Sequence, residues 1–435
     1  MKVSRTNLVL AAKRVIKFAS VGVLLFLFSL QLVDAAADLA AFQRARLEGT
    51  STQGPHEDYV VFYAAGKMVG SGDGHKLYDV AEVAKVETSV MGRPVGGRGE
   101  LAYFNPPFVA LSFLLPSYLS VEVFSLALLL FVAGMVVLAG VLLSRFLGLS
   151  KSQLLVAGLG FFSLKCVFWL LLHGQLSMFI FIGWLGFAML YIRGEKGWAG
   201  ATLALALVKP QVSLLLLAML FWKRDWQTLR GFLPVAAGLA GISLLVSGPA
   251  VIIDYPEFLM DSTGFDGKGV STMGMYGING FIAKLTGDPT PSNLWLLALG
   301  PIVLAMVLDG WRKTELSAAN LPLLAALTLS AGLLLNPHLY FQDIVLLPLA
   351  LAFGARYAYD RRGKFGYWMP LAVTAWIVQE VTGPSAAIDF NLLTPLMAGL
   401  LIVSYVELAR ASARVAEPRA ASYDGFEISP PLNAA

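Results

Sequence analysis

Long apolar segments constrain this chain more than any other feature of its sequence. A helix of about 20 apolar residues crosses the roughly 30 Å hydrocarbon core of a membrane. Because backbone polar groups inside lipid must bond to one another, such segments cross as helices. Ten segments approach or exceed this length, at residues 15–36, 121–144, 152–172, 175–192, 231–248, 294–310, 318–335, 339–356, 366–381 and 390–409. We therefore expect an all-α polytopic membrane protein.

Two further apolar stretches leave the number of crossings open. Residues 106–119 are short and bounded by prolines, and residues 198–222 carry Lys209-Pro210 at their centre. Proline removes a helical hydrogen bond, so each stretch can either cross once or dip into the membrane and return. The expected fold is a bundle of 10 to 12 transmembrane helices, with residues 1–409 forming one membrane domain.

Lys and Arg clusters predict the sidedness, because cytoplasmic loops of membrane proteins carry an excess of these residues. The first cluster, at residues 13–17, predicts a cytoplasmic N-terminus. Later clusters mark further cytoplasmic turns at Lys223, Arg224, Arg230, Arg312, Lys313, Arg356, Arg361, Arg362 and Lys364. Two large loops, at about 38–105 and 249–293, then lie outside, and the polar segment 410–435 is expected to be a disordered cytoplasmic tail.

The middle of the chain does not fix this count. Four cations are cytoplasmic only if both ambiguous stretches re-enter, which gives ten crossings; these are Arg145, Lys151, Arg193 and Lys196. If both stretches cross, there are twelve crossings and these cations face outward. The two large outer loops stay outside in either case.

Composition and the N-terminus narrow the class of protein further. The chain is 57% hydrophobic and 14% charged, and its net charge of +4 is spread over short clusters rather than one face, which argues against nucleic-acid binding. The single cysteine, Cys166, excludes an internal disulfide. Residues 1–37 resemble a secretion signal ending in Ala35-Ala36-Ala37, which we interpret as an uncleaved first span.

Asp58 is the first candidate for chemistry. It opens an apolar and aromatic run at residues 58–68, and a second amphipathic run follows at 80–90; we expect both to be helices along the membrane surface. A carboxylate beside a membrane cavity can act as a general base toward a hydroxyl. Asp is also a favoured helix N-cap, and Glu57 is its neighbour, so local sequence alone leaves both interpretations open.

Other ionisable groups lie inside or beside apolar segments, where they are costly and therefore functional candidates. Lys209 precedes a proline, so a broken helix could let its ammonium reach a buried anion. His338 follows Asn336-Pro337 at the start of a span, and His173 precedes Gly174-Gln175. Imidazoles can donate to phosphate, although snorkelling lysines and structural histidines are the common alternatives. Lys165 and Asp343 complete this set, and no metal-ligand spacing supports a divalent cation.

Several motifs, taken in order, carry a resemblance to a known family. They are Asp58-Tyr59-x-x-Phe62-Tyr63-x-Ala65-Gly66, Leu77-Tyr78-Asp79, Phe104-Asn105-Pro106-Pro107-Phe108, Gly174-Gln175, Lys209-Pro210 with Lys223-Arg224, and Asn336-Pro337-His338. Together they resemble glycosyltransferase family 87, integral membrane enzymes of the GT-C superfamily that include polyprenyl-phosphate-mannose-dependent mannosyltransferases. The resemblance spans most of the chain.

That resemblance implies an inverting sugar transfer at the outer face of the plasma (inner) membrane. The donor would be a polyprenyl-phosphate sugar, with mannose the sugar of the better-known members. The acceptor would be a hydroxyl of a lipid, glycan or glycolipid. Asp58 would be the base and His338 a second catalytic residue, with Lys209, His338, Gln175 and His173 on the donor phosphate. No cofactor is implied. Broken helices and an intramembrane lysine also fit a transporter or flippase, and a non-catalytic scaffold is a third class.

Overall fold

The structure is a computed structural model that describes residues 5–47, 58–92, 101–260, 272–288, 292–384 and 390–416. Within these ranges the chain is helical and contains no strand, which confirms the all-α expectation. The helices are α1 Arg5–Leu47, α2 Asp58–Gly70, α3 Val80–Met91, α4 Pro107–Ser112, α5 Val121–Leu147, α6 Lys151–Phe162, α7 Lys165–His173, α8 Ser177–Ile192, α9 Lys196–Leu203, α10 Leu214–Trp222, α11 Trp226–Ser247, α12 Val251–Met260, α13 Ile278–Thr286, α14 Ser292–Lys313, α15 Leu321–Leu335, α16 Leu346–Arg362, α17 Trp368–Thr382 and α18 Leu393–Ala416.

Six helical stretches in the described residues are long and apolar enough to cross a membrane, so the protein is a polytopic helical membrane protein. They belong to α1, α5, α11, α14, α16 and α18. The predicted span 152–172 is divided into α6 and α7, which meet at a bend of 52° and would make a seventh span. The predicted spans 175–192, 318–335 and 366–381 correspond to the shorter helices α8, α15 and α17. Length and composition alone therefore support fewer crossings than the 10 to 12 expected.

Both ambiguous stretches are broken in the structure. Residues 106–119 hold α4, of six residues, and the 3₁₀ turn Pro116–Tyr118. Six helical residues rise about 9 Å, far short of the hydrocarbon core. Residues 198–222 contain most of α9, the 3₁₀ turns Ala204–Val208 and Pro210–Val212, and α10. The break falls at Lys209, whose backbone is non-helical (φ −139°, ψ 80°).

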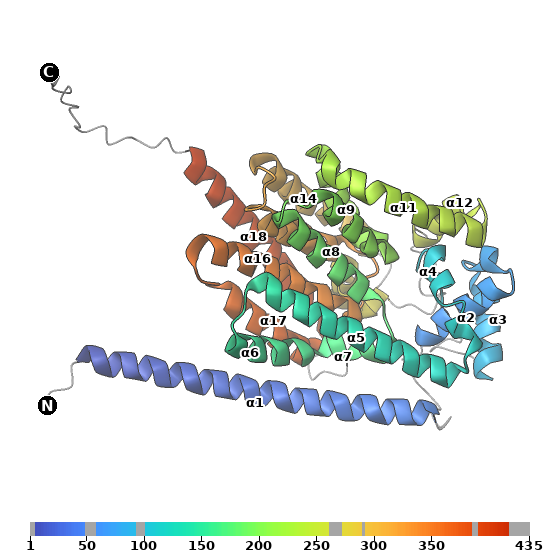
Figure 1. Cartoon of the computed structure of the whole chain (residues 1–435), viewed down its shortest axis with the longest axis horizontal. Helices are drawn as coiled ribbons and strands as arrows, with labels where there is room; N and C mark the ends of the chain where they lie inside the picture. The colour runs from blue at the N-terminus through green and yellow to red at the C-terminus, as the bar shows by residue number, and fades with distance from the viewer. Residues whose placement is uncertain are drawn as a thin grey trace, which may run out of the picture.

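The bundle has two distinct ends (Figure 1). The start of α1 and the end of α18 lie at one end, whereas α2, α3, α4 and α12 gather at the opposite end. Helix α15 is buried along almost its whole length and α16 along most of it, so these two helices form the centre of the core. An apolar helix buried on every side is expected only deep inside a large bundle.

Helix α1 runs along the outside of the bundle and is largely exposed (Figure 1). Its contacts are few but specific. Gln31 donates to the carboxylate of Glu380 in α17, Gln43 accepts from Ser125 in α5 at 3.2 Å, and the Phe28 ring meets the Trp376 ring at 4.9 Å. The small-residue site Ala35-Ala36-Ala37 lies inside this continuous helix. That this first span is not cleaved stays a prediction.

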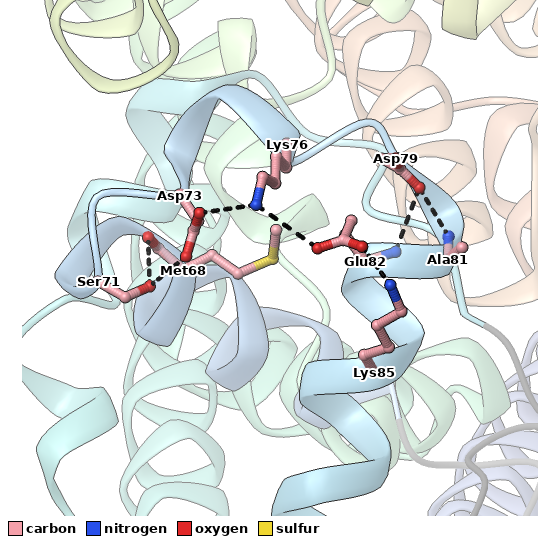
Figure 2. Close-up of polar contacts among 8 residues, drawn as sticks. All are labelled: Met68, Ser71, Asp73, Lys76, Asp79, Ala81, Glu82 and Lys85. Atoms are coloured by element: carbon pink, nitrogen blue, oxygen red, sulfur yellow. Dashed lines mark hydrogen bonds and ion pairs between the residues drawn. The ribbon is translucent and has the colours of Figure 1, made fainter.

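The segment predicted to form the first outer loop contains the two helices expected there, but α2 does not lie along a surface. Nine of its residues are buried, from Tyr59 to Met68, because α4 and α5 pack over it. The segment that joins α2 to α3 is held by exposed polar contacts (Figure 2). Lys76 pairs with Asp73 at 3.0 Å and Glu82 at 3.6 Å, and the Asp79 carboxylate caps α3 by accepting from the N–H groups of Ala81 and Glu82. Only α3 behaves as the expected exposed amphipathic helix.

Candidate functional site

Asp58 is the first described residue of α2, and its carboxylate is held by a turn far away in sequence. Gln175 Nε2 donates to Asp58 Oδ2 at 2.6 Å. His173 Nδ1 lies 3.0 Å from the same oxygen. The Asp58 side chain is 23% exposed and that of His173 is 9% exposed, so the carboxylate is the more accessible partner. The structure thus brings three predicted site residues into direct contact.

Gly174 gives this turn its shape. It ends α7 with a left-handed backbone (φ +68°), and the N–H of Gln175 donates to the carbonyl of Leu170 at 3.0 Å. A Cβ at Gly174 would lie 2.7 Å from Cδ2 of Leu128. Glycine is therefore required both for the conformation and for the space. The His173 ring also stacks on Trp169, one helical turn earlier, with centroids 5.4 Å apart.

The surroundings of Asp58 favour its ionised form. Burial by itself would raise the pKa of this carboxyl group. His173, Gln175 and Lys209 outweigh that effect and lower the pKa below its ordinary value of 3.8. The carboxylate is therefore ionised at neutral pH, stabilised by two donors and by a nearby cation.

Lys209 belongs to a second polar cluster. Its Nζ lies 2.6 Å from Asp343 Oδ1 and 3.5 Å from Ser177 Oγ, and the Ser177 hydroxyl donates to the same Asp343 oxygen. The side chain of Asp343 is only 2% exposed. A carboxylate buried this deeply needs such a partner, because an isolated charge out of water is strongly unfavourable.

One short segment of chain connects the two clusters. His173 and Gln175 contact Asp58, and Ser177, two residues later at the start of α8, contacts Asp343. The electrostatic effect of Lys209 on Asp58 is a second connection. The described residues hold no group of three or more His, Cys, Asp and Glu side chains arranged for a metal ion.

An apolar cavity lies beside these clusters. Its volume is about 530 Å³, and it is lined by residues of α4, α5, α8, α11 and the 3₁₀ turn that precedes Lys209. Its lining residues include Phe108, Phe113, Phe124 and Phe131. Leu176, between Gln175 and Ser177, and Val208, before Lys209, also line it. The cavity therefore reaches the segments that carry both polar clusters.

His338 lies in an aromatic cluster. Its ring centroid is 4.7 Å from that of Phe104, which in turn lies 5.2 Å from Phe258 of α12. Asn105, which follows Phe104 in the sequence, donates from Nδ2 to the carbonyl of Val208 at 2.9 Å. The aromatic cluster is therefore joined to the chain just before Lys209. His338 itself makes its described contacts with Phe104 and with Asn336, whose side chain accepts from the His338 N–H at 2.9 Å.

The structure adds two residues, Ser177 and Asn105, that the sequence did not single out as candidates for chemistry, because they are common residue types. It also gives Asp343, which was already a candidate as an acid within an apolar stretch, a partner in Lys209, which is 134 residues away. Glu57, the competitor of Asp58, lies outside the described residues.

Comparison with known proteins adds one match. A family model described as glycosyltransferase family 87 matches residues 103–337, which is more than half of the 435 residues. No curated protein and no solved structure matches the chain. The matched region includes His173, Gln175 and Lys209, whereas Asp58 and His338 lie outside it.

Proposed function

The chain belongs to glycosyltransferase family 87 and is a membrane glycosyltransferase, and on that premise we propose that it transfers a sugar from a polyprenyl-phosphate donor to an acceptor hydroxyl, with Asp58 as general base. The observation that carries the proposal is the way the Asp58 carboxylate is held. Both donors contact Oδ2, so Oδ1 can accept the proton of an incoming hydroxyl. Mannose is the sugar we propose first.

The reaction follows from these groups. The acceptor oxygen attacks the anomeric carbon from the face opposite the phosphate, its proton passes to Asp58 Oδ1, and the bond between carbon and phosphate oxygen breaks. The electron pair leaves with the polyprenyl phosphate, and the anomeric configuration inverts. Because the pKa of Asp58 is low, the carboxylate is ionised and ready, but it is a weak base. Proton transfer is therefore expected late, when the hydroxyl has become acidic through attack.

Lys209 is our candidate for stabilising the leaving phosphate. It is the cation that acts on Asp58, and its side chain is 14% exposed, so it is not sealed from the site. A fixed ammonium in a poorly screened cavity stabilises negative charge as it develops. We propose that Asp343 and Ser177 hold Lys209 in place before the donor binds.

His173 and Gln175 act on the base in this proposal. They were expected on the donor phosphate, and their direct contacts with Asp58 support a role in orienting its carboxylate instead. His338, with its ring against Phe104, is proposed to contact the donor phosphate or sugar from the aromatic cluster. No step of the proposal requires a cofactor.

The apolar cavity supports a lipid-linked donor. A polyprenyl chain needs an apolar channel whose end lies at the polar groups that bind the phosphate, and this cavity reaches Leu176 and Val208. The donor class and the position of the polar site thus fit one another.

The test is transfer of radiolabelled sugar by the purified protein. We expect product from a polyprenyl-phosphate sugar with membrane extract as acceptor source, and a higher donor KM in Ala127→Trp, which would fill the cavity. Val137→Trp, an exposed position elsewhere on α5, is the matched control. Solute or lipid flux in proteoliposomes with no covalent product from any donor would contradict the proposal and favour the transporter class.

A further inference from the structure

A second cavity lies between α9 and α11, at the end of the bundle opposite Asp58. We propose that it binds the headgroup of a phospholipid that carries both a phosphate and a primary ammonium, as phosphatidylethanolamine does. The cavity has a volume of about 480 Å³. It is separate from the polar clusters at Asp58 and Lys209, and its role is independent of the proposed transfer reaction.

Closely packed small residues hold α9 and α11 together at this cavity. A Cβ at Gly231 would lie 1.8 Å from the carbonyl oxygen of Gly197, and a Cβ at Gly200 would lie 1.9 Å from that of Thr228. The two helices therefore touch backbone to backbone, as small residues allow in membranes. The cavity extends along the pair from Glu195 and Lys196 to Ala201 and Pro234, so one end is polar and the other is apolar.

The charged residues of the cavity include one acid and one cation that are accessible to a ligand. Lys196 is already paired, with Asp225 at 3.3 Å and with the face of the Tyr191 ring at 4.7 Å. Glu195 and Arg230 line the cavity, are exposed, and form no ion pair with another described residue. Their opposite charges match a zwitterion. A purely anionic headgroup would leave Glu195 facing another negative charge.

The chemistry of these side chains selects the kind of zwitterion. The Arg230 guanidinium can bind phosphate oxygens with two parallel hydrogen bonds. Glu195 can accept hydrogen bonds from a primary ammonium but none from the quaternary ammonium of choline. Trp198 lines the same cavity and is 71% exposed, and amphipathic indole rings are enriched at the level of lipid headgroups. The acyl chains would then extend past Ala201 and Pro234.

The test is lipid retention by the full-length protein, followed by native mass spectrometry after exchange into defined lipids. We expect phosphatidylethanolamine to be retained about tenfold better than phosphatidylcholine or phosphatidylglycerol. Arg230→Gln should lose retention of all three lipids. Glu195→Gln should lose only the preference for phosphatidylethanolamine over phosphatidylcholine.

Two controls make the result specific. Arg312→Gln removes an exposed arginine on α14 and should retain phosphatidylethanolamine as the wild type does. Soluble phosphoethanolamine should not displace the lipid, because the apolar end of the cavity contributes to binding. Equal retention of phosphatidylethanolamine and phosphatidylcholine by the wild type would overturn the proposal. So would equal losses in Arg230→Gln and Arg312→Gln, or displacement by the soluble headgroup.

Discussion

Asp58 depends on donors that come from one turn 115 to 117 residues further along the chain. Local sequence could suggest a helix cap or a base, and it could not choose between them. The contact with His173 and Gln175 explains why the residue is ionised in spite of its burial. Sequence reasoning placed His173 and Gln175 in the site but on a different partner, because the pairing of residues so far apart depends on tertiary structure.

Gln175→Leu tests this control of the base. The change removes the Nε2 donor while keeping a similar side-chain volume, so the pKa of Asp58 should rise and the acid limb of the pH–rate profile should move to higher pH. Transfer at neutral pH should still fall by about tenfold, because the carboxylate loses one of the two contacts that orient it toward the acceptor hydroxyl, and this loss outweighs the gain in basicity. The pH–rate profiles of wild type and variant measure this. Gln153→Leu, at the exposed start of α6, should leave the acid limb unchanged.

Lys209 and Asp343 should show strong coupling in stability. Lys209→Met leaves the Asp343 carboxylate buried without its cation, which should cost about 3–5 kcal/mol of unfolding free energy. The double variant Lys209→Met/Asp343→Leu should recover most of that loss, because neither charge remains. Thermal unfolding in detergent measures both. Sugar transfer should stay low in both variants, and a single variant as stable as the double would contradict the pairing.

The end of α7 is the helix terminus on which the site depends most. Its left-handed glycine, Gly174, directs His173 and Gln175 to the same carboxylate oxygen. The sequence Gly174-Gln175 was visible as a motif. Its function as a helix C-cap could not be predicted, because residues 152–172 read as one continuous span rather than two helices with a 52° bend.

Gly174→Ala is the matching prediction. A left-handed alanine costs roughly 1–2 kcal/mol, and its Cβ would also lie too close to Leu128. We expect about tenfold slower transfer with little change in helix content by circular dichroism. Adding Leu128→Ala should relieve the steric contact but not the backbone strain, so recovery should be partial. Full activity of Gly174→Ala alone would contradict a role for this turn in positioning His173 and Gln175.

At the scale of the whole molecule, hydropathy predicted the class and most helix positions. Long apolar runs such as 121–144 and 294–310 became single long helices, α5 and α14. Hydropathy could not predict the ends of the shorter or broken runs. A helix such as α15 can be short because it is buried inside the bundle. Bent connections are tolerated there because the surrounding protein satisfies their backbone polar groups. The polar pairs across the bundle lay beyond any pattern in the sequence.

The arrangement predicts the membrane topology. Helix α5 runs from the end where α2 and α3 lie to the end where α1 begins (Figure 1), so Lys151 at the start of α6 should be cytoplasmic, and residues 106–119 should re-enter rather than cross. Because Cys166 is buried, we expect little background reaction of the wild-type protein with maleimide in single-cysteine labelling. Lys85→Cys should react with an impermeant maleimide in intact cells. Lys151→Cys and Arg312→Cys should react only after permeabilisation, and labelling of Lys151→Cys in intact cells would favour twelve crossings.

The role of Asp58 as base is the central claim, and sugar transfer by Asp58→Asn measures it most directly. The amide keeps the shape and cannot accept the proton, so we expect transfer to fall at least about 100-fold, in the range of general-base catalysis, while binding of the polyprenyl-phosphate donor persists. Asp73→Asn changes an exposed acid in the segment that joins α2 to α3 (Figure 2) and should transfer at the wild-type rate. Undiminished transfer by Asp58→Asn would contradict the mechanism.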